Sequence, residues 1–176
     1  MKRPKKDRKT SLPKPRTLLQ QLARVPEKLF SGAFQQQYAA LCFRSARDDE
    51  LEILLVTSRD SGRWLIPKGW PMKGKKPHEA ALIEAWEEAG VRGRVKKKPV
   101  GRYTYLKMLD NGDVTPCVVD VFQIEVSDTK TSFKERGERR VDWVSPVEAA
   151  RRVREIELKS LLVDFKPVRS KKDISD

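Results

Sequence analysis

The stretch ALIEAWEEAG, residues 81–90, places three carboxylates, Glu84, Glu87 and Glu88, within five positions. Residues three and four apart share one face of an α-helix, so these acids should form one acidic face. The residues expected to pack against a sheet on roughly the opposite side are Leu82, Ala85, Trp86 and Ala89. An acidic helix face is unexpected in a chain of 176 residues whose formal charge is +13.

The ends of this helix are marked in the sequence. Pro77 suits the first helical turn and Gly90 suits the position just after the last one, which predicts a helix over residues 77–89. A loop rich in Gly and Pro precedes it and carries Lys68, Lys73, Lys75 and Lys76. Carboxylates beside cations suit a hard divalent metal ion together with phosphate. The alternative is a solvated acidic face, which is the usual meaning of a charge run on a helix.

The remaining apolar runs predict a sheet around this helix. Strands are expected within residues 37–44, 51–58, 63–67, 100–109, 114–126 and 141–145. The turn sequence DNGD, residues 110–113, predicts a hairpin between two of them. Two further short helices are expected from residue 146 to about 154 and then to about 165. Because strands occur in groups between the helices, we expect an α/β (α+β) fold with a mixed sheet flanked by helices.

The positive charge lies mainly in the ends of the chain. Residues 1–16 hold eight basic residues against one acidic residue. We expect a basic, largely disordered tail with a short helix over residues 1–30, a folded domain over 31–165 and a basic tail over 166–176. The two cysteines predict buried, reduced thiols and a cytoplasmic protein. No apolar stretch approaches the roughly 20 residues of a membrane span.

Six residues in one register carry a resemblance to a known family. They are Gly69, Glu84, Glu87, Glu88, Gly90 and Val91. Their spacing is similar to the Nudix box, and the preceding RWLIPKGW, residues 63–70, is also typical of Nudix hydrolases. Two box positions differ, because Lys75 stands where the box has its first Glu and Ile83 stands where it has Arg.

The resemblance implies a Nudix fold, a mixed β-sheet sandwiched between α-helices, and hydrolysis of a nucleoside diphosphate linked to another group, dependent on Mg²⁺ or Mn²⁺. It implies that Glu87 and Glu88 bind the metal and that Glu84 binds it too or acts as the base toward water. The metal site would also include Gly69 and the backbone carbonyl of Lys68. Candidates for one further ligand are Glu125, Glu135 and Glu138, of which Glu138 is the weak choice.

Within that family, residues 38–70 and 137–149 are most similar to diphosphoinositol polyphosphate phosphohydrolases, which also cleave diadenosine polyphosphates. Arg59, Arg63 and Lys68, with Arg44 as a weaker candidate, would bind substrate phosphates, for which guanidinium forks are well suited. The alternative for the loop arginines is simple solvation. Trp70 and Tyr103 could stack on a base, although packing is the expected role of both.

A second class of function stays open at this point. The basic tail could bind nucleic acid through its charge, either in a catalytically impaired Nudix-fold protein or in one that processes RNA caps. No recognised nucleic-acid motif supports this reading, and the basic residues do not alternate with aromatic ones. We therefore expect an enzyme acting on a phosphorylated small molecule, with no membrane partner.

Overall fold

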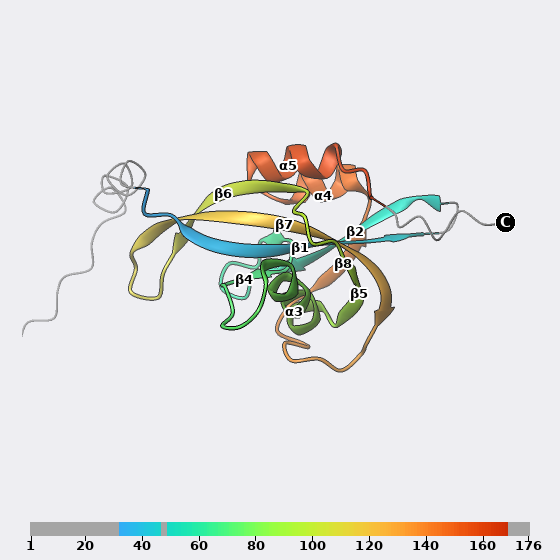
Figure 1. Cartoon of the computed structure of the whole chain (residues 1–176), viewed down its shortest axis with the longest axis horizontal. Coiled ribbons are helices and arrows are strands. Elements are labelled where there is room, and N and C mark those ends of the chain that lie inside the picture. The colour runs from blue at the N-terminus through green and yellow to red at the C-terminus, as the bar shows by residue number, and fades with distance from the viewer. Residues whose placement is uncertain (1–31, 47–48, 169–176) are drawn as a thin grey trace, which may run out of the picture.

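A computed structural model describes residues 32–46 and 49–168 of the chain (Figure 1). The short helix expected within residues 1–30 lies outside the described residues, as does most of the predicted C-terminal tail. None of the helices in the described part is long and apolar enough to cross a membrane.

One eight-stranded sheet forms the centre of the fold. Its strands are β1 (Gln35–Ser45), β2 (Leu51–Thr57), β3 (Trp64–Leu65), β4 (Lys68–Gly69), β5 (Val91–Val95), β6 (Gly101–Met108), β7 (Val114–Thr129) and β8 (Val141–Val144). The strand order is β3-β2-β1-β7-β5, with β4 also on β1, β6 on β7 and β8 on β2. The long β1–β7 pairing is parallel and the other pairings are antiparallel, which confirms the expected mixed sheet.

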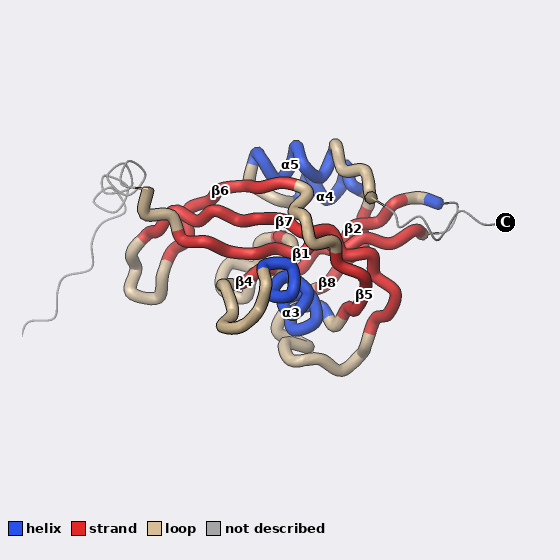
Figure 2. The backbone as a smooth tube through the Cα atoms, in the orientation of Figure 1, coloured by secondary structure: helices blue, strands red, loops and turns tan. Residues whose placement is uncertain are grey.

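Helices cover both faces of this sheet, as Figure 2 shows. Helix α3 (Pro77–Ala89) lies on one face, and α4 (Pro146–Arg152) and α5 (Ile156–Val163) lie on the other. Alternation along β1 separates the two cores, since Leu41 packs in the cluster beneath α4 and α5 while Cys42 packs in the cluster beneath α3. The predicted sandwich of sheet and helices is therefore confirmed.

Small residues bring α3 close to the sheet. Ala81, Ala85 and Ala89 recur every four residues and are at most 2% exposed, so their short side chains let the helix backbone approach the strands. The prediction that Trp86 packs on the sheet is wrong: Trp86 is only half-buried and its ring carries the Arg92 guanidinium, 4.1 Å from the ring centroid. The close approach of α3 sets the position of the acidic side chains that it carries.

Strand β4 was predicted as part of the loop before α3, but Lys68 and Gly69 pair with β1; strand β5 was not expected from the sequence at all. Its five residues, VRGRV, contain only two apolar side chains, and the strand pairs along the edge of β7 with a register shift between Arg92 and Gly93. The hairpin of β6 and β7 is as predicted, and its turn is closed by a hydrogen bond from Leu109 N to Asp113 O (2.8 Å). Cys42 and Cys117 are buried and unpaired, as expected.

Gly90 has two independent reasons to be glycine. It ends α3 in the left-handed region, with φ 67°, and a Cβ there would overlap the Phe133 ring and the Lys130 carbonyl. Gly74 also has a positive φ, 74°, but a Cβ there would meet no neighbouring atom. A comparison of Gly74 with Gly90 therefore separates the cost of a left-handed backbone from the cost of steric overlap.

We expect Gly74→Ala to lower the free energy of unfolding by about 1 kcal/mol, the usual cost of a left-handed residue with a side chain. Gly90→Ala should cost at least about 1 kcal/mol more, because the loop that contacts it must also move. Urea denaturation of both variants measures the difference. Equal losses of stability in the two variants would show that the overlap with Phe133 and Lys130 costs no free energy.

Candidate functional site

The acidic face of α3 forms part of the wall of a cavity of about 350 Å³. The charged residues in its lining are Arg59, Asp60, Lys68, Glu84, Glu87, Glu88, Lys107, Glu135 and Arg139. The sequence prediction that the three α3 acids share one site is consistent with this placement. The same cavity also holds cations contributed by β4 and β6, so acids and bases of widely separated segments meet there.

Glu88 is the most deeply buried of the three acids, with 4% exposure. One carboxylate oxygen accepts a hydrogen bond from the Lys68 backbone amide (3.3 Å), and the other accepts one from Arg139 Nη2 (2.6 Å). Burial raises the pKa of Glu88 to about 7, opposed by the charge of Arg139 and reinforced by that of Glu84. A cation entering the site would favour the ionised form of this carboxylate.

Glu84 differs from its neighbours in having no fixed partner. Within residues 32–46 and 49–168, no side chain or backbone group makes a hydrogen bond or ion pair with its carboxylate. Burial raises its pKa, as do the charges of Glu87 and Glu135. Its carboxylate occupies the space where a Cβ at Gly69 would stand, which explains why a glycine is needed at that position of β4.

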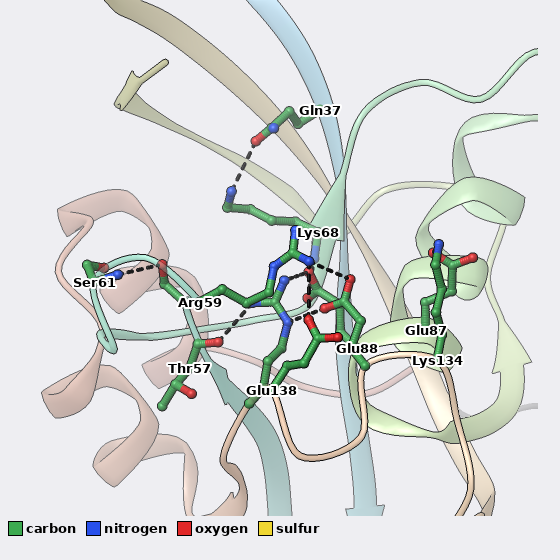
Figure 3. Close-up of polar contacts among 12 residues, drawn as sticks. Gln37, Thr57, Arg59, Ser61, Lys68, Glu87, Glu88, Lys134 and Glu138 are labelled. Carbon is green, nitrogen blue, oxygen red and sulfur yellow. Dashed lines mark hydrogen bonds and ion pairs between the residues drawn. The ribbon is translucent and has the colours of Figure 1, made fainter. Parts of the chain in front are cut away.

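Glu87 and Glu135 complete the acidic side. Glu87 accepts a hydrogen bond from Lys134 Nζ (2.7 Å), and both residues are labelled at the right of Figure 3. Glu135 comes from the segment before β8, its side chain is 12% exposed, and it accepts a bond from Arg139 Nε (2.6 Å). Of the three candidates for a further ligand, Glu135 lines the cavity, whereas Glu125 and the weak choice, Glu138, are absent from its lining.

Lys68 supplies a partly buried cation to the site. Its Nζ donates to Gln37 Oε1 (3.2 Å) and to the Tyr105 hydroxyl (2.7 Å), so the side chain reaches away from Glu88 while its backbone amide holds that carboxylate (Figure 3). Burial lowers the pKa of Lys68 to about 8, and the positive charge of Lys107 acts in the same direction. A bound phosphate would satisfy both lysines, since an anion offsets their mutual repulsion.

Of the other three predicted phosphate ligands, one lines the cavity and two do not. Arg59 lines the cavity and pairs with Glu138 (3.3 Å). Arg63 instead pairs with Glu155 at the start of α5 (3.1 Å), and Arg44 pairs with Glu52 (2.7 Å) while stacking on Trp143; neither lines the cavity. The structure therefore brings together Lys68 and Arg59 with the α3 acids, and it leaves Arg63 and Arg44 outside.

Five charged or polar residues used in this description of the site were not singled out in the sequence: Gln37, Tyr105, Lys107, Lys134 and Arg139. Gln37 carried only a weak signal, because it stands where the polar start of β1 meets its apolar part. The structure buries it to 1% exposure. Arg139 carried none, since it lies 51 residues from Glu88 and is one of several basic residues in its segment.

The donor set fits a hard divalent cation. Every acidic ligand offered is a carboxylate oxygen, which Mg²⁺ and Mn²⁺ prefer. Across the described residues, however, no three His, Cys, Asp or Glu side chains converge closely enough to hold an ion by themselves.

Comparison with known proteins identifies the family. The NUDIX domain model matches residues 35–164, and the chain therefore belongs to the Nudix family. Diphosphoinositol polyphosphate phosphohydrolase 3-alpha of Mus musculus is 44% identical over 62 residues, covering 35% of this chain and 37% of that protein. Diphosphoinositol polyphosphate phosphohydrolase 2 of Homo sapiens is 40% identical over 62 residues, covering 35% and 34%. The match spans only about a third of the curated relatives.

Solved structures share the fold at lower identity. A C. elegans Ap4A hydrolase aligns with a TM-score of 0.54 and 19% identity, covering 74% of this chain and 94% of that one. The MutT protein from Methanosarcina mazei Go1 aligns with a TM-score of 0.53 and 21% identity, covering 74% and 91%. These likenesses confirm the Nudix fold.

We expect Gly69→Ala to displace the Glu84 carboxylate without unfolding the protein. Gly69 does not have a positive φ, and the atoms that a Cβ would meet are the far end of a flexible side chain. Mn²⁺ affinity, measured by electron paramagnetic resonance, should fall about tenfold or more. Gly101→Ala is the matched control, because its Cβ would meet only the end of Leu161 outside the cavity. Unchanged Mn²⁺ binding by Gly69→Ala would remove Glu84 from the metal site.

Proposed function

We propose that the chain is a divalent-metal-dependent Nudix pyrophosphohydrolase that uses Mg²⁺ or Mn²⁺. The observation that carries this proposal is the division of one cavity into an acidic part on α3 and a cationic part formed by Lys68 and Lys107. A polyphosphate substrate with its metal ion offers charges complementary to both parts. The membership of the Nudix family and the names of the phosphohydrolase relatives support the same reaction.

The side chains divide the work according to their partners. Glu87 and Glu88 would hold the ion, because their carboxylates face the cavity and each keeps lone pairs beyond those used by its present donors. Glu84 would offer one carboxylate oxygen to the ion as well, and it would take the proton from the attacking water, since its carboxylate is unpartnered and its pKa is raised. Lys68, Lys107 and Arg59 would hold the phosphates. When bound, the ion supplies an activated water and neutralises charge on the leaving phosphate.

The choice of substrate lies between diphosphoinositol polyphosphates, named for the curated relatives, and dinucleoside polyphosphates such as the one named for the C. elegans structure. Trp70 favours the second class. It is 41% exposed at the edge of the site cavity and also lines an adjacent cavity of about 350 Å³ with Gln35, Leu109 and Thr115. An exposed indole beside a phosphate site can stack on a base, which inositol lacks. Tyr103, by contrast, is 2% exposed and belongs to the core.

The predicted nucleic-acid binding depends on the basic tail of residues 1–30, which lies outside the described residues. A cytoplasmic location stays a prediction as well. Both are independent of the proposed hydrolysis, which depends on the cavity alone.

We expect the parent protein to release phosphate or nucleotide from a diadenosine polyphosphate only when Mg²⁺ or Mn²⁺ is present. Glu88→Gln should abolish this activity, and Glu84→Gln should lower kcat by about 10²–10⁴, the usual contribution of a general base. Glu157→Gln is the control, since this carboxylate lies on α5 and is bonded by Thr104 outside the cavity. Parental activity in Glu88→Gln would refute the assignment.

The substrate class is tested by Trp70→Ala with both substrates and Mg²⁺. Loss of one base-stacking contact should raise KM for the diadenosine polyphosphate about 10-fold or more and leave KM for a diphosphoinositol polyphosphate within about threefold. Trp143→Ala is matched, because this indole stacks with Arg44 away from the cavity. A parent that prefers the inositol substrate, or a Trp70 variant affected equally with both, would contradict the nucleotide assignment.

A further inference from the structure

The segment Lys130–Arg140, between β7 and β8, is fixed to the helix that carries the acids. Lys130 N donates to Gly90 O (2.8 Å) and Glu135 N donates to Glu87 O (3.0 Å). These backbone bonds place the segment, called the 130–140 loop below, along the C-terminal half of α3. Cations on this loop therefore have a defined position relative to the acidic face.

Arg139 uses its whole guanidinium fork within this arrangement. Nη2 donates to Glu88 Oε1 (2.6 Å), Nε donates to Glu135 Oε2 (2.6 Å) and Nη1 donates to the Thr57 carbonyl (2.8 Å). The side chain is only 8% exposed. The backbone of the next residue is held too, because Arg140 N donates to Thr57 Oγ1 (2.9 Å) and Thr57 N donates to Arg140 O (3.0 Å). A planar fork with this many fixed partners has one available orientation.

Glu88 is consequently held at both oxygens. The Lys68 amide fixes one oxygen from β4, and Arg139 fixes the other from the 130–140 loop. A carboxylate has about four acceptor positions, so two such bonds orient it while leaving lone pairs for an ion. Bonds of this kind from outside the ligand shell are known to set ligand orientation at metal sites.

The helix itself offers no substitute for Arg139. No Lys or Arg occurs between Pro77 and Ala89, and position 83 holds an isoleucine. The cations that meet the acids come instead from the 130–140 loop, Lys134 on Glu87 and Arg139 on Glu88. Lys134 is 63% exposed and makes a single pair that water screens, whereas the Arg139 contacts are buried. Arg139 is therefore the cation positioned to act on the site.

We propose that Arg139 is a positioning residue that orients Glu88, and with it Glu135, for binding the divalent ion. This inference rests on the proposed function, because it assigns Glu88 to the metal. It names a task for the 130–140 loop that the acidic helix cannot perform alone.

Two variants test the proposal. Arg139→Met removes the fork and its charge, and Arg139→Lys keeps the charge but can reach fewer acceptors. Mn²⁺ affinity, read by electron paramagnetic resonance without substrate, should fall about 10- to 100-fold in Arg139→Met and by a smaller factor in Arg139→Lys. With substrate and saturating Mn²⁺, kcat should fall while KM stays within about threefold, because Arg139 is assigned no phosphate.

A folded Arg139→Met that binds Mn²⁺ as tightly as the parent, or more tightly, overturns the proposal, since Arg139 would then be neutral or a competitor of the ion. Should Arg139→Met fail to fold by circular dichroism, Arg139→Lys decides on the same criterion. Arg152→Met is the matched control: Arg152 also joins two acids, Asp142 (2.6 Å) and Glu148 (2.8 Å), but lies on α4 outside the cavity. It should lose stability and keep its Mn²⁺ affinity.

The proposed function fails separately, if the parent binds Mn²⁺ but hydrolyses no diphosphate bond. Metal binding then still reports on Arg139.

Discussion

The burial of the Glu88 carboxylate is the constraint on which the site depends. A carboxylate that is 4% exposed must be hydrogen-bonded or neutralised, because an unpaired buried charge is strongly unfavourable. Its two partners come from β4 and from the loop before β8, so one side chain of α3 joins three separate parts of the chain. Stability and the arrangement of the site are thereby linked at a single group.

Small residues, alanine and glycine, make the burial of the acids possible. The alanines of α3 let the helix approach the sheet, Gly69 leaves room for the Glu84 carboxylate, and Gly90 leaves room for Phe133 and Lys130. Each of these positions serves packing and placement at once, since a larger residue would move an acidic side chain or the loop that pairs with it. The local geometry thus explains why Gly69 and Gly90, the two glycines that match the Nudix box, must be glycine.

Local signals predicted the parts of the fold that are determined locally. Pro77 and Gly90 bounded α3 correctly, and the turn at residues 110–113 identified the hairpin of β6 and β7. Strand β5 was missed because an edge strand with two apolar residues carries little pattern. The spacing of Glu84, Glu87 and Glu88 placed the acids, but Arg139 could not be found, because its role follows from contacts across 51 residues of sequence.

The electrostatic arrangement also explains why the acids, within the part of the chain that the structure describes, do not form a complete ion site by themselves. Arg139 and Lys134 already occupy lone pairs of Glu88 and Glu87, and Lys68 and Lys107 place positive charge in the same cavity. An isolated divalent ion would meet both attraction and repulsion there. Phosphate groups that bind the lysines would remove the repulsion and add oxygen ligands, so ion and substrate should each strengthen the binding of the other. Such coupling would restrict the activated water to complexes in which a diphosphate is present to receive it.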